Sequence, residues 1–221
     1  MASLLEYLKI PLAEFKRVSV IVLIVTNLVP IFGVVFLDWQ VFIVMSIFWT
    51  ENVVIGIFNV LKMAFAPSAN TGKQETKSTL IPFFCIHYGI FTLIHGILVF
   101  AIFGGIFEHD NLITGITDSY KALANYPFAW TVLALAISHA VSYVVNYIAK
   151  GEWKKTSLEQ LMVQPYIRVI ILHLTILFGG FLVMILNSPA VGLVLLIILK
   201  TYVDIKSHLK QHSFITANSS P

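Results

Sequence analysis

Long apolar stretches alternate with short polar ones along the whole chain. Six of the stretches approach the length of about 20 apolar residues that crossing a bilayer core requires. They lie near residues 18–37, 40–63, 82–105, 127–149, 166–187 and 189–207. Short turns at Asp38-Trp39 and at Asn187-Ser188-Pro189 separate two of the pairs. The pattern predicts an all-α, polytopic membrane protein with six transmembrane helices in one bundle.

The composition supports this class. Of the 221 residues, 58% are hydrophobic and 11% are charged, whereas soluble domains average about 25% charged residues. The net charge of +3 is too small to indicate nucleic-acid binding. The single cysteine excludes an internal disulfide and any multi-thiolate metal site. The partners to expect are therefore membrane lipids.

The positive charges predict an orientation. If the N-terminus is inside, only Lys121 of the 14 Lys and Arg residues falls on the outer side. The positive-inside rule then predicts that both termini are cytoplasmic and that the chain is a multi-pass protein of the cell inner (plasma) membrane.

Three regions follow from these spans. Residues 1–17, with a capping-box pattern at Ser3 and Glu6, are expected to form an amphipathic helix on the membrane surface. Residues 18–207 form the transmembrane domain and residues 208–221 a cytoplasmic tail. The loop 153–164 is expected to be a second surface helix, and the outer loop 106–126 a solvated connection.

Polar side chains interrupt five of the six spans at helical spacing. An ionisable group in hydrocarbon costs roughly 2.5–3.5 kcal/mol, so each one needs a partner or a purpose. Residues at i, i+3 or i+4 and i+7 share one helix face. The resulting stripes are Asn52, Gly56, Asn59 and Met63; Tyr88, Thr92 and His95; His139, Ser142 and Asn146; His173, Gly180 and Asn187; and Lys200, Asp204, His208 and Gln211. All five are expected to face one polar interior.

Depth divides the ionisable residues into two layers. At about 1.5 Å of rise per residue, Glu51, His95 and His139 fall roughly 15–20 Å from the cytoplasmic boundary. A second layer, nearer that boundary, contains His87, His173, Asp204 and His208.

The second layer predicts a divalent metal site, with zinc as the natural ion. His87, His173 and His208 supply three imidazole ligands, and Asp204 is a fourth ligand or orients one of them. Such a site could activate water against a lipid-like substrate from the bilayer, with Glu51 or Asp204 as proton acceptor. Each histidine could instead donate a single hydrogen bond between helices.

Two other functions fit the same residues, so whether the protein is an enzyme stays open. In a proton-coupled transporter of an ion or small molecule, Glu51, His95 and His139 would titrate. In a b-type haem protein, which is less favoured, His87 and His173 would be the axial ligands.

The segment FWTENVVIGIFNVLKM, residues 48–63, resembles the hallmark helix of an uncharacterised prokaryotic family of multi-pass membrane proteins. Its pattern is W-x-E-N-x-x-x-G-x-x-N-x-x-K. The segments FFCIHYGIFTLIHG (83–96) and LKTYVDIKSHLKQH (199–212) resemble later motifs of that family. The resemblance implies a polytopic fold and a special role for Glu51, Asn52, Asn59, His87, Asp204 and His208. It implies no activity, because the family is a domain of unknown function.

Overall fold

The computed structural model describes most of the chain between residues 28 and 205. The described residues are 28, 30–67, 77–106, 110–154, 156–166, 169–170, 172–174, 176, 185, 193–194, 197–198, 201–202 and 205. Regular structure in this part of the chain is helical throughout, with no strand. This confirms the predicted all-α class.

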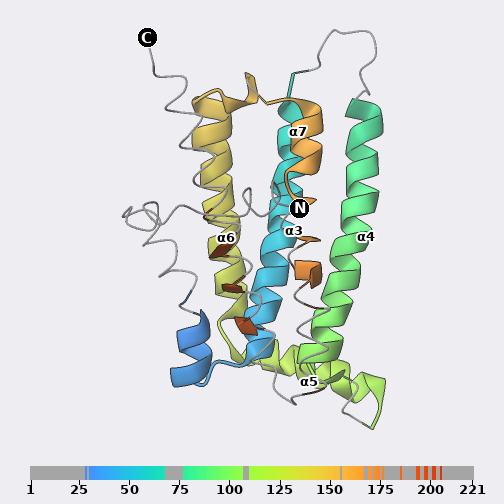
Figure 1. Cartoon of the computed structure of the whole chain (residues 1–221), viewed down its shortest axis with the longest axis vertical. Helices are drawn as coiled ribbons and strands as arrows, with labels where there is room; N and C mark the ends of the chain where they lie inside the picture. Colours follow the sequence, from blue (N-terminus) through green and yellow to red (C-terminus); the bar gives the residue numbers. More distant parts are fainter. Residues whose placement is uncertain are drawn as a thin grey trace, which may run out of the picture.

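Three upright helices form the frame of the molecule (Figure 1). Helix α3 spans Val41–Phe65, α4 spans Lys77–Phe103, and α6 spans Phe128–Ser142 and continues as the π-helix η3, Tyr143–Ala149. All three are long and apolar enough to cross a membrane, and they match three of the predicted spans. The first, fifth and sixth predicted spans lie only partly within the described residues, so the count of six stays a prediction.

Two short helices lie at opposite ends of this frame. Helix α5, Leu112–Asn125, lies crosswise at the lower ends of the upright helices (Figure 1). The loop predicted at 106–126 is thus largely helical. Helix α5 begins at Leu112 because the Asn111 side chain accepts a hydrogen bond from the Thr114 N–H at 2.8 Å and so caps the first turn.

Helix α7, Leu158–Val163, follows the 3-10 turn η4, Glu152–Lys154, and contacts both α3 and α4. A capping box between Ser157 and Gln160 starts it. Leu158 and Leu161 are buried in the core, so this segment docks into the bundle and does not lie on its surface as predicted. The other predicted surface helix, 1–17, and the tail 208–221 lie outside the described residues.

Helix α3 is the centre of the bundle, since it contacts α4, α6, α7 and η3. One core cluster surrounds its first turns and a second surrounds its last turns. The first cluster joins Met45 and Val99 to residues from later in the chain, namely Leu172, Ile176, Leu193 and Ile197. Portions of the predicted fifth and sixth spans therefore pack against α3 and α4.

Helices α3 and α4 approach closely at two glycines. A Cβ on Gly96 would lie 2.6 Å from Trp49 Cε2, and a Cβ on Gly56 would lie 2.5 Å from Tyr88 Cε1. Each aromatic ring therefore rests on the backbone of the other helix. Small residues permit this kind of approach between transmembrane helices.

Each of these rings also donates a hydrogen bond across the interface. Trp49 Nε1 donates to the Thr92 carbonyl at 2.8 Å, and the Tyr88 hydroxyl donates to the Asn52 carbonyl at 2.9 Å. Both acceptors lie four residues before the glycine that the ring covers. We call this arrangement of Trp49, Gly96, Tyr88 and Gly56 the reciprocal clasp. It joins the two helices while every donor involved finds an acceptor.

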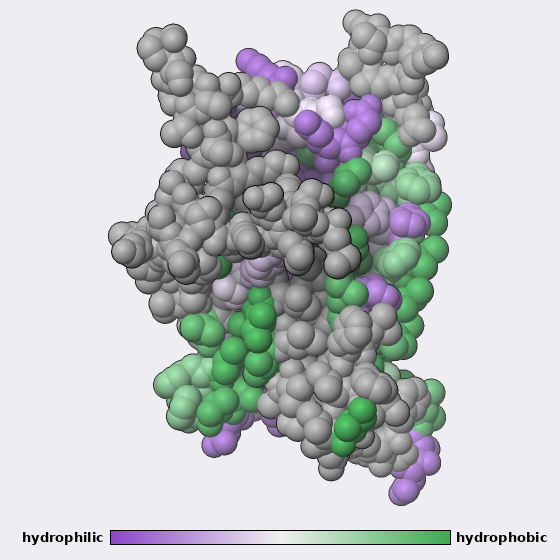
Figure 2. Space-filling model, in the orientation of Figure 1, coloured by the Kyte–Doolittle hydropathy of each residue, from purple (hydrophilic) through white to green (hydrophobic). Residues whose placement is uncertain are grey.

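On the face seen in Figure 2, the described flank at the right is mainly apolar with a few polar residues between, and polar residues are most frequent at the upper end. On α4 the exposed large side chains include Phe83, Ile86, Ile90, Leu93 and Ile97. Hydrocarbon, and not water, is the solvent in which such a surface is stable.

The clasp predicts that adding a single methyl group at either glycine destabilises the protein. Gly56→Ala and Gly96→Ala should each lower the free energy of unfolding by about 1–3 kcal/mol, because the new Cβ overlaps a packed ring. Gly89→Ala on α4 is the matched control, since its Cβ would meet nothing within 4 Å. Thermal unfolding in detergent measures all three. Equal midpoints for the three variants would contradict the clasp.

Candidate functional site: a buried histidine pair

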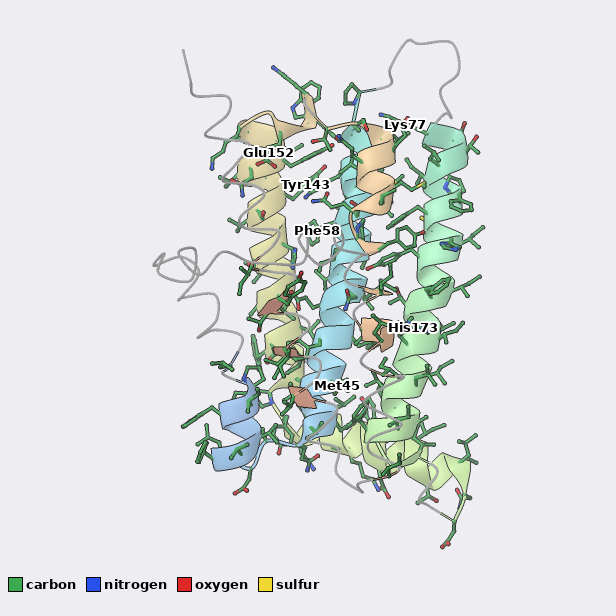
Figure 3. The ribbon with its side chains drawn as sticks, viewed as in Figure 1. Met45, Phe58, Lys77, Tyr143, Glu152 and His173 are labelled. Atoms are coloured by element: carbon green, nitrogen blue, oxygen red, sulfur yellow. The ribbon has the colours of Figure 1, made fainter. Side chains whose placement is uncertain are left out.

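Two histidines from distant parts of the chain are hydrogen-bonded inside the bundle. His95 of α4 is only 1% exposed, and its Nε2 lies 2.9 Å from His173 Nδ1. The rings meet edge to face, with centroids 5.0 Å apart. Figure 3 shows His173 in the space between the ribbons of α3 and α4. We call these two residues the histidine pair.

The backbone of α4 sets the orientation of the His95 ring. His95 Nδ1 is hydrogen-bonded to the Phe91 carbonyl one turn earlier. A carbonyl oxygen only accepts, so Nδ1 carries a proton. In a neutral His95, Nε2 then has the lone pair and accepts the N–H of His173 Nδ1. The direction of the bond between the rings is thus fixed by a contact outside the pair.

The depth predicted for His173 was wrong. The sequence places it nearer the cytoplasmic boundary than His95, whereas the structure places the two rings in contact. The chain has already entered the bundle before residue 166, because the Asn59 amide of α3 donates to the Leu161 carbonyl at 2.8 Å. Counting depth from residue 166 therefore starts too close to the surface.

His87 belongs to a different contact. Its Nδ1 lies 2.7 Å from the Tyr166 hydroxyl, and its ring stacks on Phe83 with centroids 5.3 Å apart. Eight residues of α4, or about 12 Å of helix, separate His87 from His95. The expected convergence of His87 with His173 is not found. Tyr166, which the sequence analysis did not single out, takes that place.

No group of three or more His, Cys, Asp or Glu residues suited to a metal occurs among the described residues. Two of the four predicted ligands, His87 and His173, are in separate pairs. The other two, Asp204 and His208, lie outside the described residues, so their role stays a prediction.

The stripes predicted for α3 and α4 do face the interior. Asn52, Gly56, Asn59 and Met63 are buried, as are Tyr88, Thr92 and His95. The amide groups of both asparagines donate to backbone carbonyls. Asn52 Nδ2 donates to Phe48 O at 2.9 Å within α3, and Asn59 Nδ2 donates to the Leu161 carbonyl of α7. Two polar atoms of the stripes, Asn52 Oδ1 and Thr92 Oγ1, are buried without a hydrogen-bond partner in the described structure.

The predicted midplane layer of Glu51, His95 and His139 is divided between two sides of α3. The His139 ring stacks on Phe58 of α3, with centroids 6.1 Å apart. Glu51 lies seven residues before Phe58 and so shares its face. His95 instead lies on the α4 side, next to the clasp glycine Gly96. The structure therefore does not bring Glu51, His95 and His139 together in one polar chamber.

The polar stripe of α6 differs from its prediction as well. Asn146 donates to Ser142 Oγ at 3.3 Å and accepts from Lys150 Nζ at 2.8 Å. These residues form a ladder along their own helix, and α6 buries none of its residues. Asn146 consequently contributes to no interior site with the histidine pair.

Removing either member of the histidine pair should reveal an energetic coupling. His95→Leu and His173→Leu are each expected to lower stability, because each leaves an imidazole nitrogen of the partner ring, buried in His95 and part-buried in His173, without its hydrogen bond. The double variant should lose less than the sum, by roughly 0.6–1.7 kcal/mol, which are the average and the largest coupling of interhelical hydrogen bonds in membranes. Unfolding in denaturant measures the cycle. His87→Leu combined with His173→Leu is the control and should be additive. An additive result for His95 and His173 would mean that the pair contributes nothing.

Comparison with known proteins extends over nearly the whole chain. No curated protein and no solved structure matches it. A match to a family description covers residues 9–220, which include the clasp, the histidine pair and all three candidate spans. The chain therefore belongs to the family of unknown function DUF6498.

Proposed function

We propose that the histidine pair transfers protons within the membrane, and that the protein is a proton-coupled transporter of an ion or small molecule. The observation that carries this proposal is the 2.9 Å contact between two imidazole nitrogens, one of them on a side chain that is 1% exposed. Ionisable residues buried in a transmembrane bundle commonly serve as proton relays.

The fixed tautomer of His95 gives the pair a direction for proton transfer. A proton arriving at His173 Nε2 allows the Nδ1 proton to pass to His95 Nε2. His173 is then neutral again, and His95 carries the charge with Nδ1–H still donated to Phe91 O. Because charge is costly in this environment, the protonated state favours a helix arrangement that stabilises it. That preference can couple protonation to transport.

The proposal includes six spans with both termini in the cytoplasm of the cell inner (plasma) membrane. Lys62, Lys77, Lys150 and Lys154 lie at one end of the bundle, where Lys77 Nζ donates to the Ala64 carbonyl at 2.8 Å. Lys121 lies on α5 at the other end. This asymmetry supports a cytoplasmic location for the lysine-rich end. The burial of Leu172, Ile176, Leu193 and Ile197 supports further spans in the bundle.

A metal centre acting on a lipid-like substrate is the second candidate. The two ring nitrogens of the pair are close enough to share one ion, since zinc–nitrogen bonds measure about 2.0–2.1 Å. Asp204 and His208 would have to complete the ligand set, with Glu51 or Asp204 as proton acceptor. The separate pairing of His87 and His173 gives no support to a haem held between them.

Proton binding by the pair should produce a charge displacement in response to a pH step. The reconstituted protein on a solid-supported membrane should give a transient current that His95→Gln and His173→Gln each reduce at least tenfold. His87→Gln is the matched control and should keep the current, because His87 lies eight residues, or about 12 Å of helix, before His95. Transients that persist in both pair variants would refute the proton relay.

Elemental analysis of protein purified without chelator separates the two candidates. A proton relay predicts no stoichiometric transition metal. A metal present at about one per chain, lost in His95→Gln and His173→Gln but kept in His87→Gln, would favour the metal centre.

The topology is tested by reporter fusions after Asn125, where α5 ends, and at the C-terminus. The two fusions should report opposite sides of the membrane, with the C-terminal one cytoplasmic. If both report the same side, the span count is wrong, and if the C-terminal fusion reports the outer side, the orientation is wrong.

A further inference from the structure

Helix α5 has three distinct faces. Its residues advance by 100° each, so positions four and seven apart fall together. One face consists of small side chains against the bundle, a second is apolar and exposed, and a third is polar. A helix in contact with protein and water alone would have no use for an exposed apolar face.

The small face fixes how α5 is rotated. A Cβ on Gly115 would lie 2.5 Å from the Ile106 carbonyl oxygen, so the two backbones are in direct contact. One turn later, Ser119 Oγ donates to the Gly104 carbonyl at 3.1 Å and is buried. These two contacts determine which side chains point away from the bundle.

The exposed apolar face consists of four large side chains. Their exposed fractions are 58% for Leu112, 77% for Ile113, 49% for Ile116 and 70% for Tyr120. Leu112, Ile116 and Tyr120 follow one another at a spacing of four, and Ile113 is seven residues before Tyr120. The contacts of the small face hold this stripe outward, away from the core.

The polar face lies on the other side of the stripe. Lys121 Nζ and Asp118 Oδ1 form an exposed ion pair at 2.9 Å, and Thr117 is exposed beside them. Thr114, which binds the Asn111 cap, belongs to the same face. The helix is therefore amphipathic on the part of its surface that the bundle leaves uncovered.

We propose that α5 is an interfacial helix that binds membrane lipids at this end of the bundle, independently of what the histidine pair does; that these lipids belong to the outer leaflet rests on the orientation proposed above. It connects the end of α4 to the start of α6, two helices apolar enough to span a membrane, and lies across their ends (Figure 1). The apolar stripe enters the boundary between acyl chains and headgroups, and the polar face meets water.

The surroundings of α5 favour lipid as the occupant. Trp130 in the first turn of α6 is 74% exposed, and Trp and Tyr are enriched at membrane–water interfaces. Exposed apolar side chains also occur on α4, where Ile94 is 48% and Ile97 is 60% exposed, so the stripe is part of a largely apolar outer surface. A second copy of the chain is the competing occupant, and it makes a different prediction.

Spin labels on α5 test the proposal in reconstituted vesicles of phosphatidylethanolamine and phosphatidylglycerol. Cys85 is first replaced by alanine, and single cysteines are then placed at Ile113 and Ile116, with Thr117 and Lys121 as matched controls on the polar face. Labels at 113 and 116 should collide more with oxygen, which partitions into lipid, than with a water-soluble nickel chelate. Labels at 117 and 121 should show the opposite preference.

Two results would overturn the proposal. Greater collision with the nickel chelate at 113 and 116 would place the stripe in water. Low collision with both reagents, together with spin–spin broadening between copies, would place it against a second chain. Substituting exposed side chains leaves the small face intact, so the labelled variants keep the contacts that orient α5.

Discussion

The close approach of α3 and α4 is the contact on which the rest of the described structure depends. The hydrocarbon core of a bilayer cannot hydrogen-bond to a polar group, so a transmembrane bundle must satisfy such groups from within. The reciprocal clasp does this with donors that also pack: the rings of Trp49 and Tyr88 cover Gly96 and Gly56, and their polar ends reach the carbonyls of Thr92 and Asn52. Because Gly96 is fixed against Trp49, the adjacent His95 is held deep in the bundle, where His173 meets it.

The clasp also changes how the polar residues of α3 are understood. Asn52 and Asn59 stand out in the sequence as candidates for chemistry, yet the amide of each donates to a carbonyl in the helical frame. Trp49 and Gly56, which carry no reactive group, are as important to the arrangement. Within the described residues, two imidazole rings share one hydrogen bond only at the histidine pair, whereas His87 is paired with the Tyr166 hydroxyl. The proposed proton relay depends on the frame holding these two rings together.

The sequence predicted what depends on periodicity. Apolar length located α3, α4 and α6, and helical spacing identified the buried stripes that contain Asn59 and His95. The sequence could not predict features that depend on where α7 brings the chain back into the bundle. The depth of His173 follows from α7 docking against Asn59, a contact between residues 102 positions apart. Helical spacing also cannot tell whether a polar stripe faces the interior of the bundle. Asn146 and Ser142 share such a stripe, yet they hydrogen-bond to each other along their own helix. The sequence did contain a signal for the clasp, because each helix carries a large aromatic residue and a glycine. Gly56 follows Trp49 by seven residues, and Gly96 follows Tyr88 by eight.

Nuclear magnetic resonance can detect the hydrogen bond between His95 and His173 directly. In reconstituted protein labelled with ¹⁵N-histidine, a scalar coupling should connect His95 Nε2 to His173 Nδ1 through the shared proton. The coupling should vanish in His173→Gln and persist in His87→Gln, whose partner in the native protein is Tyr166. A spectrum in which no two imidazole nitrogens are coupled, with the His95 and His173 signals independent of each other, would show that the two rings do not share a hydrogen bond.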